Sequence, residues 1–157
     1  MPTNDAHATR TSASDGDRFS VAWGDLRRRL REQDLLEEEQ AVSAETNITH
    51  LTDDSREVAP GSTFIAIRGT EADGHSFIED AVEKGARLIV CEEIPESVSE
   101  HGSDTAFARV ADTRVALAEM AAALYGDPAD QLRMVGVTGT NGKTTVAFLV
   151  HHLLDAL

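Results

Sequence analysis

Residues 132–145 read LRMVGVTGTNGKTT, and this stretch decides the class of fold that the sequence predicts. An apolar run over residues 132–139, predicted to be a strand, leads into a glycine-rich loop. The loop opens a largely apolar segment over residues 144–157 that predicts a helix. Gly139 and Gly142 allow the backbone to curl so that successive N–H groups point inward at phosphate oxygens. The order of strand, glycine loop and helix predicts a phosphate-binding loop in an α/β protein.

The chemistry of this loop suits a nucleoside triphosphate with Mg²⁺. Lys143 is expected to span the β- and γ-phosphates as the catalytic cation, and the Thr144 hydroxyl is expected to ligate Mg²⁺. The usual spacing of such loops has glycine six residues before the lysine, where this chain has Val137. The alternative is a strand–turn–helix corner whose glycines serve only for bending. The nucleotide contacts expected from the loop are Gly139, Thr140, Asn141, Gly142, Lys143, Thr144 and Thr145.

The rest of the chain alternates between helical and strand patterns, as an α/β protein does. Helices are predicted over 19–36, 75–85 and 113–126, and strands over 48–52, 63–67, 87–91 and 106–110. Asp112 is expected to cap the third helix, and Gly85 and Gly126 are placed to end two of them. A boundary near Asp112 would separate a first domain over 19–112 from a second over 113–157. The polar residues 1–18 predict a disordered tail.

Composition excludes several classes of function. The net charge of −14, from 28 acidic and 14 basic residues, argues against a nucleic-acid partner. No apolar run approaches the roughly 20 residues that span a bilayer, and the N-terminus lacks the apolar core of a signal peptide. We therefore expect a cytoplasmic protein without membrane contact. Cys91 lies in an apolar run and is expected to be a buried strand residue, and His75 is expected to cap a helix or to lie at the surface.

Three quoted stretches together resemble the Mur ligases, the ATP-dependent amide-forming enzymes of bacterial cell-wall precursor synthesis. They are DSREVAPGSTFIAIRGTEADGHSFIEDAVEKGARLIV from residue 54, ALAEMAAALYGDP from residue 116, and TGTNGKTT from residue 138. The resemblance covers residues 46–157. It implies a small N-terminal substrate domain followed by the strand, phosphate loop and helix that begin a truncated ATP-binding central domain. It also implies a fragment that forms no amide bond alone, because further domains of such a ligase are missing.

Within the family, Asn141 and the triplet Asp54-Ser55-Arg56 resemble the branch that adds a diamino acid, meso-diaminopimelate or L-lysine, to UDP-N-acetylmuramoyl-L-alanyl-D-glutamate. That reaction uses ATP and Mg²⁺ and passes through an acyl phosphate. The alternatives are the D-alanyl-D-alanine-adding branch and a non-catalytic UDP-sugar-binding module. Carried over position by position, the resemblance implies UDP-substrate contacts at Asp53, Ser55, Thr70, Glu71 and Ala72. The residues alone leave open a simple Asp/Ser turn in which Arg56 pairs with a carboxylate.

Overall fold

The computed structural model describes residues 19–70, 72–95 and 104–156. The predicted tail at 1–18 and the predicted contact Glu71 lie outside the described residues. The chain divides into two compact units, Met1–Gly126 and Asp127–Leu157. The two units are therefore described separately.

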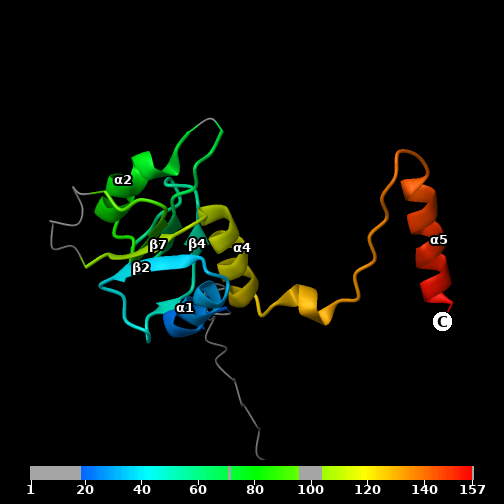
Figure 1. Ribbon diagram of the computed structural model, residues 1–157, viewed down its shortest axis with the longest axis horizontal. Coiled ribbons are helices and arrows are strands. Elements are labelled where there is room, and N and C mark those ends of the chain that lie inside the picture. Colours follow the sequence, from blue (N-terminus) through cyan, green and yellow to red (C-terminus); the bar gives the residue numbers. More distant parts are fainter. Residues whose placement is uncertain (1–18, 71, 96–103, 157) are drawn as a thin grey trace, which may run out of the picture. The chain divides into compact units, whose positions relative to one another are not determined.

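The first unit is built on a mainly parallel sheet, which confirms the α/β class (Figure 1). Its strand order is β2-β7-β6-β5-β4. The four parallel strands are β4 (Leu51–Thr52), β5 (Thr63–Ile65), β6 (Leu88–Cys91) and β7 (Ala106–Val110), and β2 (Leu36–Gln40) joins β7 antiparallel at one edge. A separate antiparallel pair is formed by β1 (Val21–Ala22) and β3 (Asn47–Ile48).

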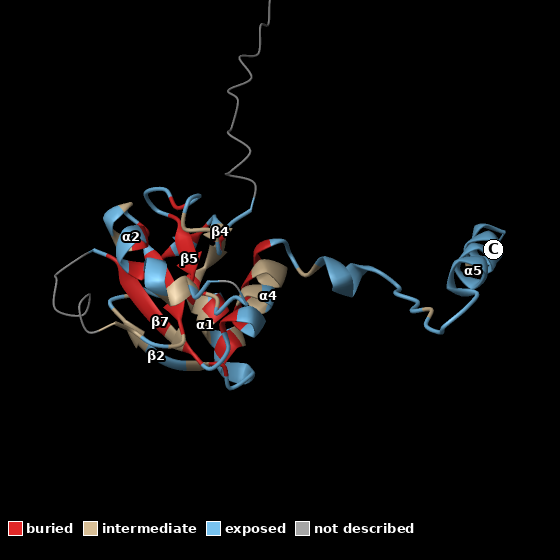
Figure 2. Cartoon of the chain, turned by 90° about the horizontal axis from the view of Figure 1, so that it is seen from above, coloured by how far each residue is buried: buried red, intermediate tan, exposed pale blue. Residues whose placement is uncertain are grey.

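Helices cover both faces of this sheet, so its central strands are apolar on both sides. Every residue of β6 is buried. Leu88 and Val90 pack in the core shared with α1 (Trp23–Glu32) and α4 (Thr113–Leu124), whereas Ile89 and Cys91 pack in the core shared with α2 (Ile78–Glu83). This alternation follows from the two-residue repeat of a strand. The buried residues, red in Figure 2, accordingly gather in the sheet and on the inner sides of the helices.

The first helix is shorter than the predicted 19–36 at both ends. It begins at Trp23, and Phe19 instead lies exposed with its ring edge-on to Tyr125, 5.2 Å between centroids. It ends at Glu32 because the chain reverses through Asp34 at a φ of 55°, and the next residues form β2. The acidic strand β2 was not expected. Arg109 of β7 supports it through ion pairs to Glu37 at 2.6 Å and to the neighbouring glutamate at 3.3 Å.

Other predicted elements are found with altered bounds. The strand expected at 48–52 is two short strands, because β3 pairs with β1 and β4 pairs with β5. The strand expected at 63–67 ends at Ile65. The helix expected at 75–85 is a 3₁₀ turn, η2 (Gly74–Phe77), followed by α2. Gly85 ends α2 at a φ of +83°, as predicted.

Helix α4 belongs to the first unit, so the domain boundary expected at Asp112 is wrong. Asp112 caps α4 as predicted, accepting hydrogen bonds from the N–H groups of Arg114 at 2.8 Å and Val115 at 3.0 Å. The helix then packs against α1, where Arg29 donates to Glu119 at 2.7 Å and both helices contribute to one core. This packing moves the boundary to the segment after Gly126.

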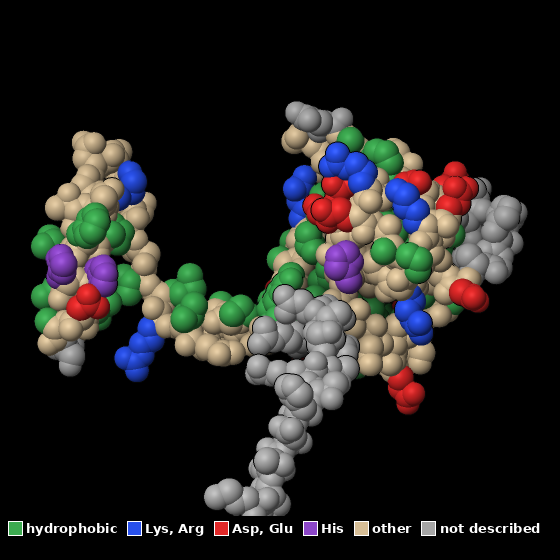
Figure 3. Space-filling view, turned by 180° about the vertical axis from the view of Figure 1, so that it is seen from behind, with side chains coloured by type: hydrophobic (Ala, Val, Ile, Leu, Met, Phe, Trp, Pro, Cys, Tyr) green, Lys and Arg blue, Asp and Glu red, His purple; other side chains and the backbone are tan. Residues whose placement is uncertain are grey.

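The second unit contains a 3₁₀ turn, η3 (Pro128–Gln131), and the helix α5 (Lys143–Asp155). The strand predicted at 132–139 does not form, since the described part of this unit offers no other strand to satisfy its backbone groups. Hydrophobic side chains, green in Figure 3, are exposed along α5: Val146, Phe148, Leu149, Leu153 and Leu154. Within the described residues, no helix has both the length and the apolar character needed to cross a bilayer.

Candidate functional site

A cleft of about 800 Å³ lies at the carboxyl ends of β4 and β5 in the first unit. Asp53 follows the last residue of β4, and the Ile67–Gly69 segment follows β5. Ligands of open α/β sheets bind at this edge, where loops leave the strands. We call it the β4–β5 cleft, and its lining is Asp53, Asp54, Ser55, Arg56, Ile67, Gly69, Thr70, Ala72, Gly74, Phe77 and Arg114.

The structure brings together the predicted substrate contacts that it describes. Asp53, Ser55, Thr70 and Ala72 all line the β4–β5 cleft, although 15 residues of sequence separate Ser55 from Thr70. Glu71 lies between two of these lining residues but outside the described part of the chain. The prediction therefore identified one place in the fold.

One wall of the cleft is a turn fixed by its own side chains. The Asp54 N–H donates to the Thr52 hydroxyl at 3.1 Å, and the Asp54 carboxylate accepts from the N–H of Arg56 at 2.9 Å and from its Nε at 2.8 Å. The bonds from Arg56 lower the pKa of Asp54 to about 2. The Asp/Ser turn considered from the sequence is thus present, and it places Ser55 beside the cleft.

The opposite wall is a tight loop that only glycine permits at two positions. Gly69 donates to the carbonyl of Ala72 at 2.9 Å, and Gly74 donates to the carbonyl of Ile67 at 2.8 Å. A Cβ on Gly69 would lie 2.6 Å from the Ala72 oxygen, and one on Gly74 would lie 2.7 Å from backbone atoms of Ile67. These contacts are too close for any side chain, so the two glycines set the path that presents Thr70 and Ala72 to the cleft.

Two lining residues were missed by the sequence reasoning. Phe77 falls within the helix predicted over 75–85, but the 3₁₀ turn leaves it 40% exposed at the cleft. Arg114 was assigned to the other domain, and it reaches the cleft from the first turn of α4. The only sequence signal for Arg114 was a cation at the start of an alanine-rich helix.

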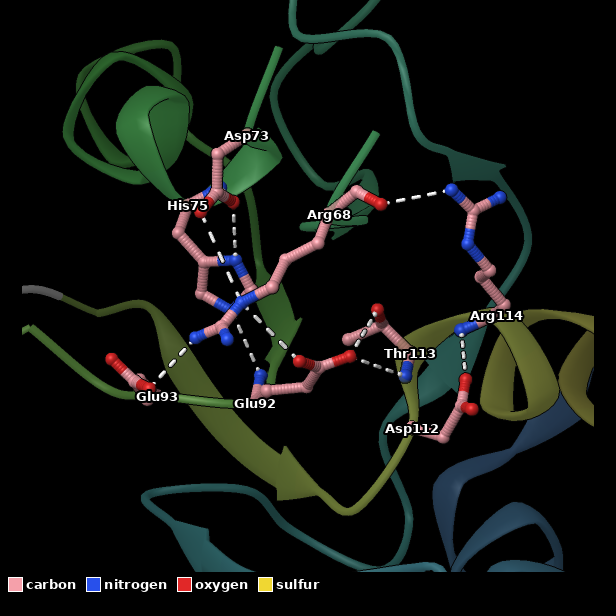
Figure 4. Close-up of polar contacts among 8 residues, drawn as sticks. All are labelled: Arg68, Asp73, His75, Glu92, Glu93, Asp112, Thr113 and Arg114. Carbon is pink, nitrogen blue, oxygen red and sulfur yellow. Dashed lines mark hydrogen bonds and ion pairs between the residues drawn. The ribbon is translucent and has the colours of Figure 1, made fainter. Parts of the chain in front are cut away.

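His75 links the second wall to Glu92, the residue that follows β6, as Figure 4 shows. Its Nε2 accepts the N–H of Glu92 at 2.9 Å, so that nitrogen carries no proton. Its Nδ1 then donates to Asp73 at 2.8 Å, and Asp73 also caps η2 by accepting the N–H of residue 75 at 3.0 Å. The side chain is 13% exposed, so it is neither the cap nor the surface residue expected.

The predicted phosphate loop forms a turn at the start of α5. Gly139 has a φ of +145° and Gly142 a φ of +76°, both in the region that favours glycine, and the helix begins at Lys143. The Lys143 ammonium donates to the Gly139 carbonyl at 2.7 Å, so it already points back over the loop. Residues 140–145 are exposed. A cation and the first N–H groups of a helix can together bind phosphate.

Other reactive side chains belong neither to the cleft lining nor to the loop. Burial raises the pKa of the Cys91 thiol to about 12, so the predicted structural role of this cysteine is confirmed. His151 pairs with Asp155 at 3.1 Å on α5. No three His, Cys, Asp or Glu side chains of the described residues gather to hold a metal.

Comparisons with known proteins point to one family. A family profile described as "Mur ligase family, catalytic domain" matches residues 47–125. The UDP-N-acetylmuramoyl-L-alanyl-D-glutamate–2,6-diaminopimelate ligase of Phocaeicola vulgatus is 44% identical over 110 residues, which are 70% of this chain and 22% of that protein. The protein of the same name from Chlorobaculum tepidum is 48% identical over 122 residues, 78% of this chain and 23% of that protein.

A solved structure agrees in fold. It is the UDP-N-acetylmuramoylalanyl-D-glutamyl-2,6-diaminopimelate–D-alanyl-D-alanyl ligase from Acinetobacter baumannii, with a TM-score of 0.55 and 26% identity. The match covers 88% of this chain and 28% of that one. The chain thus spans less than a quarter of the length of the two curated relatives, at 22% and 23%.

Proposed function

This chain belongs to the Mur ligase family, and on that premise we propose that it supplies the UDP-substrate domain and the phosphate loop of a diaminopimelate-adding ligase. The acceptor substrate would be UDP-N-acetylmuramoyl-L-alanyl-D-glutamate. The names of the two curated relatives support both substrates. The reaction consumes ATP, and we place it in the cytoplasm.

The observation that carries this proposal is the lining of the β4–β5 cleft. Four of the five substrate contacts expected from the resemblance line it, and the fifth lies outside the described residues. Its volume of about 800 Å³ suits a nucleotide, because small-molecule pockets span roughly 300–1,000 Å³. In the proposed complex the Ser55 and Thr70 hydroxyls bind polar atoms of the uridine end. The exposed ring of Phe77 offers an apolar surface for the base.

The phosphate loop would serve the first, ATP-dependent step of the reaction. The terminal carboxylate of the glutamate attacks the γ-phosphorus of ATP, and ADP leaves. The amine of diaminopimelate then attacks the acyl carbon, loses a proton and displaces phosphate. Lys143 would exchange its bond to the Gly139 carbonyl for phosphate oxygens and stabilise the charge on the transferring group.

The loop residues fit a nucleotide with its metal. Gly139 and Gly142 carry no Cβ, which leaves room for phosphate beside the backbone, and their positive φ angles are ones that glycine adopts readily. Mg²⁺ would reduce the repulsion between the two anionic reactants. Thr144 is the described residue that would ligate the ion through its hydroxyl, with phosphate oxygens beside it.

A second candidate function is the D-alanyl-D-alanine-adding activity, because the solved structure whose fold is similar is named as a ligase of that kind. The sequence identity of 26% to that ligase, against 44% and 48% to the diaminopimelate ligases, favours the first proposal.

The test is calorimetry of the full 157-residue chain with UDP-N-acetylmuramoyl-L-alanyl-D-glutamate. We expect binding that Ser55→Ala weakens by about 0.5–1.5 kcal/mol, the contribution of one hydrogen bond. Ser43→Ala is the matched control, because Ser43 lies away from the β4–β5 cleft and accepts a bond from the Glu45 N–H at 3.3 Å. A folded chain that gives no heat at millimolar ligand would show that the cleft is not the substrate site.

The phosphate loop is tested in a complete ligase that carries this segment. Lys143→Ala should lower turnover by roughly a hundredfold or more, because it removes a charge that stabilises the transition state. Affinity for the UDP substrate should stay close to that of the unaltered enzyme. Turnover near the unaltered rate would refute the role of Lys143.

A further inference from the structure

Arg114 is a cation in the β4–β5 cleft that lacks an acidic partner among the described residues. The cleft lining holds one other arginine, Arg56, whose guanidinium pairs with Asp54. By contrast, the side chain of Arg114 makes one described contact, a hydrogen bond from Nη2 to the carbonyl of Arg68 at 2.8 Å. A protein of net charge −14 thus presents an exposed arginine in its cleft without neutralising it.

A closed ring of polar contacts holds Arg114 in place, and Figure 4 shows its members converging from three segments. One Glu92 oxygen accepts from the N–H of Thr113 at 3.2 Å and from its hydroxyl at 3.0 Å. The other oxygen lies 3.3 Å from Nε of Arg68. The ring closes through the bond from Arg114 to Arg68. We call these four residues, Arg68, Glu92, Thr113 and Arg114, the Glu92 clamp.

The Glu92 clamp joins the cleft loop to α4. Arg68 precedes the loop that carries Thr70, and Arg114 lies in the first turn of α4. Glu93 adds a further contact to Arg68 at 2.7 Å. The clamp therefore fixes the distance between the loop and the guanidinium before any ligand arrives, which reduces the ordering cost of binding.

The chemistry of Arg114 fits a phosphate group. A guanidinium has five N–H donors in a planar fork, and the bond to Arg68 uses one of them. The fork matches two phosphate oxygens at once, and charge-assisted bonds of this kind are about twice as strong as neutral ones. Arg56 already has its charge paired with the carboxylate of Asp54. The guanidinium of Arg114 has no such carboxylate among the described residues, so its charge is available to a phosphate.

We propose that Arg114 binds the diphosphate of the UDP-linked substrate and that the Glu92 clamp positions it to do so. This inference rests on the proposed function, since it assigns a residue to the phosphate end of the ligand in the same cleft. The Ser55 and Thr70 walls would then hold the uridine, and Arg114 the diphosphate. Arg114 is the binding residue, and Glu92 is a positioning residue that acts through it.

The experiment compares UDP with uridine, which differ only in the diphosphate, by NMR titration of the full chain. Arg114→Gln should weaken UDP about ten- to a hundredfold, the range of a charge-assisted bond, and leave uridine within about twofold. Arg114→Lys keeps the charge without the fork and should lose less. Arg87→Gln is the control, because Arg87 is exposed at the amino-terminal edge of β6 and away from the cleft.

The positioning role of Glu92 is tested by a double-mutant cycle with Arg114. Glu92→Ala should weaken UDP and spare uridine, and combining it with Arg114→Gln should add little further loss, because both changes act through one guanidinium. A purely structural role of Glu92 would weaken both ligands alike.

The outcomes separate the two proposals. If the unaltered chain is folded and does not bind UDP, the cleft itself is wrongly assigned and this inference falls with it. If UDP binds and Arg114→Gln leaves its affinity unchanged, or weakens uridine equally, the cleft stands and the role of Arg114 is refuted. An equal loss of UDP affinity in Arg87→Gln would show a general charge effect and also overturn it.

Discussion

Replacing Glu92 by alanine should destabilise the first unit by about 2–3 kcal/mol, most of it through Thr113. Thr113 is 0% exposed, and its N–H and hydroxyl both donate to Glu92. Leaving buried donors without an acceptor costs roughly 1–3 kcal/mol. The pair with Arg68 adds about 0–1 kcal/mol, since both side chains are partly exposed, at 48% and 24%. For a unit of this size we expect the melting temperature to fall by about 8–12 °C.

The assay is urea and thermal unfolding followed by circular dichroism, with Glu93→Ala as the matched control. Glu93→Ala also removes a carboxylate that binds Arg68, but that side chain is 78% exposed, so its loss should cost less than about 1 kcal/mol. Thr113→Val added to Glu92→Ala should recover about half of the loss, because the buried hydroxyl is gone while the backbone N–H remains unpaired. Equal destabilisation by Glu92→Ala and Glu93→Ala would refute the reasoning.

Three further predictions concern a helix cap, a carboxylate and a thiol. In urea titrations, Asp112→Ala should lower the free energy of unfolding by about 1 kcal/mol, because it removes the cap of α4. Asp112→Asn should lower it by much less, since asparagine still caps a helix. Equal losses in the two variants would contradict the capping role. The Asp54 carboxyl should titrate in NMR near pH 2, and Arg56→Ala should move the midpoint up toward about 4. Because the folded pKa is lowered, this turn stabilises the protein above about pH 4 and that stabilisation is lost as the pH falls through about 2; an unshifted midpoint in the unaltered chain would refute the pairing. The Cys91 thiol, with a pKa of about 12 from burial, should resist a thiol reagent at pH 8 in the native protein and react once guanidinium unfolds it; rapid native reaction would contradict its burial.

The elements that the sequence predicted well carry a local signal. The run at β6 is apolar throughout, and α4 has both a capping aspartate and a terminating glycine. The acidic strand β2 carries none, because LEEEQ shows no apolar alternation. What holds it is antiparallel pairing with β7, from Leu36 opposite Val110 to Gln40 opposite Phe107, and Arg109 adds an ion pair to Glu37 across 72 residues of sequence. An interaction between segments so far apart cannot be read from a local pattern.

Tertiary context also explains the two errors around the boundary. The apolar run at 132–139 has the composition of a strand, but a strand forms only beside another strand. Helix α4 was assigned to the wrong unit because its packing on α1 depends on the whole sheet.

The parts of the cleft that local turns and glycines shape could be predicted from the sequence. Ser55 lies in a turn that Asp54 enforces, and Gly69 and Gly74 shape the loop that carries Thr70. The resemblance connected these positions before the structure placed them together. Phe77 and Arg114 were not predictable in the same way. A 3₁₀ turn and the docking of α4 bring them to the cleft, and neither follows from residue spacing.

The most direct test of the central claim is the location of the bound substrate. UDP-N-acetylmuramoyl-L-alanyl-D-glutamate is titrated into the ¹⁵N-labelled chain, and each backbone amide is followed by NMR. The substrate should shift the amides of Ser55, Thr70 and Arg114 at the carboxyl ends of the strands, and leave those of Thr46 and Thr105 at the other end of the sheet unmoved. Shifts confined to Thr46 and Thr105, or no shift in the β4–β5 cleft at saturating ligand, would contradict it.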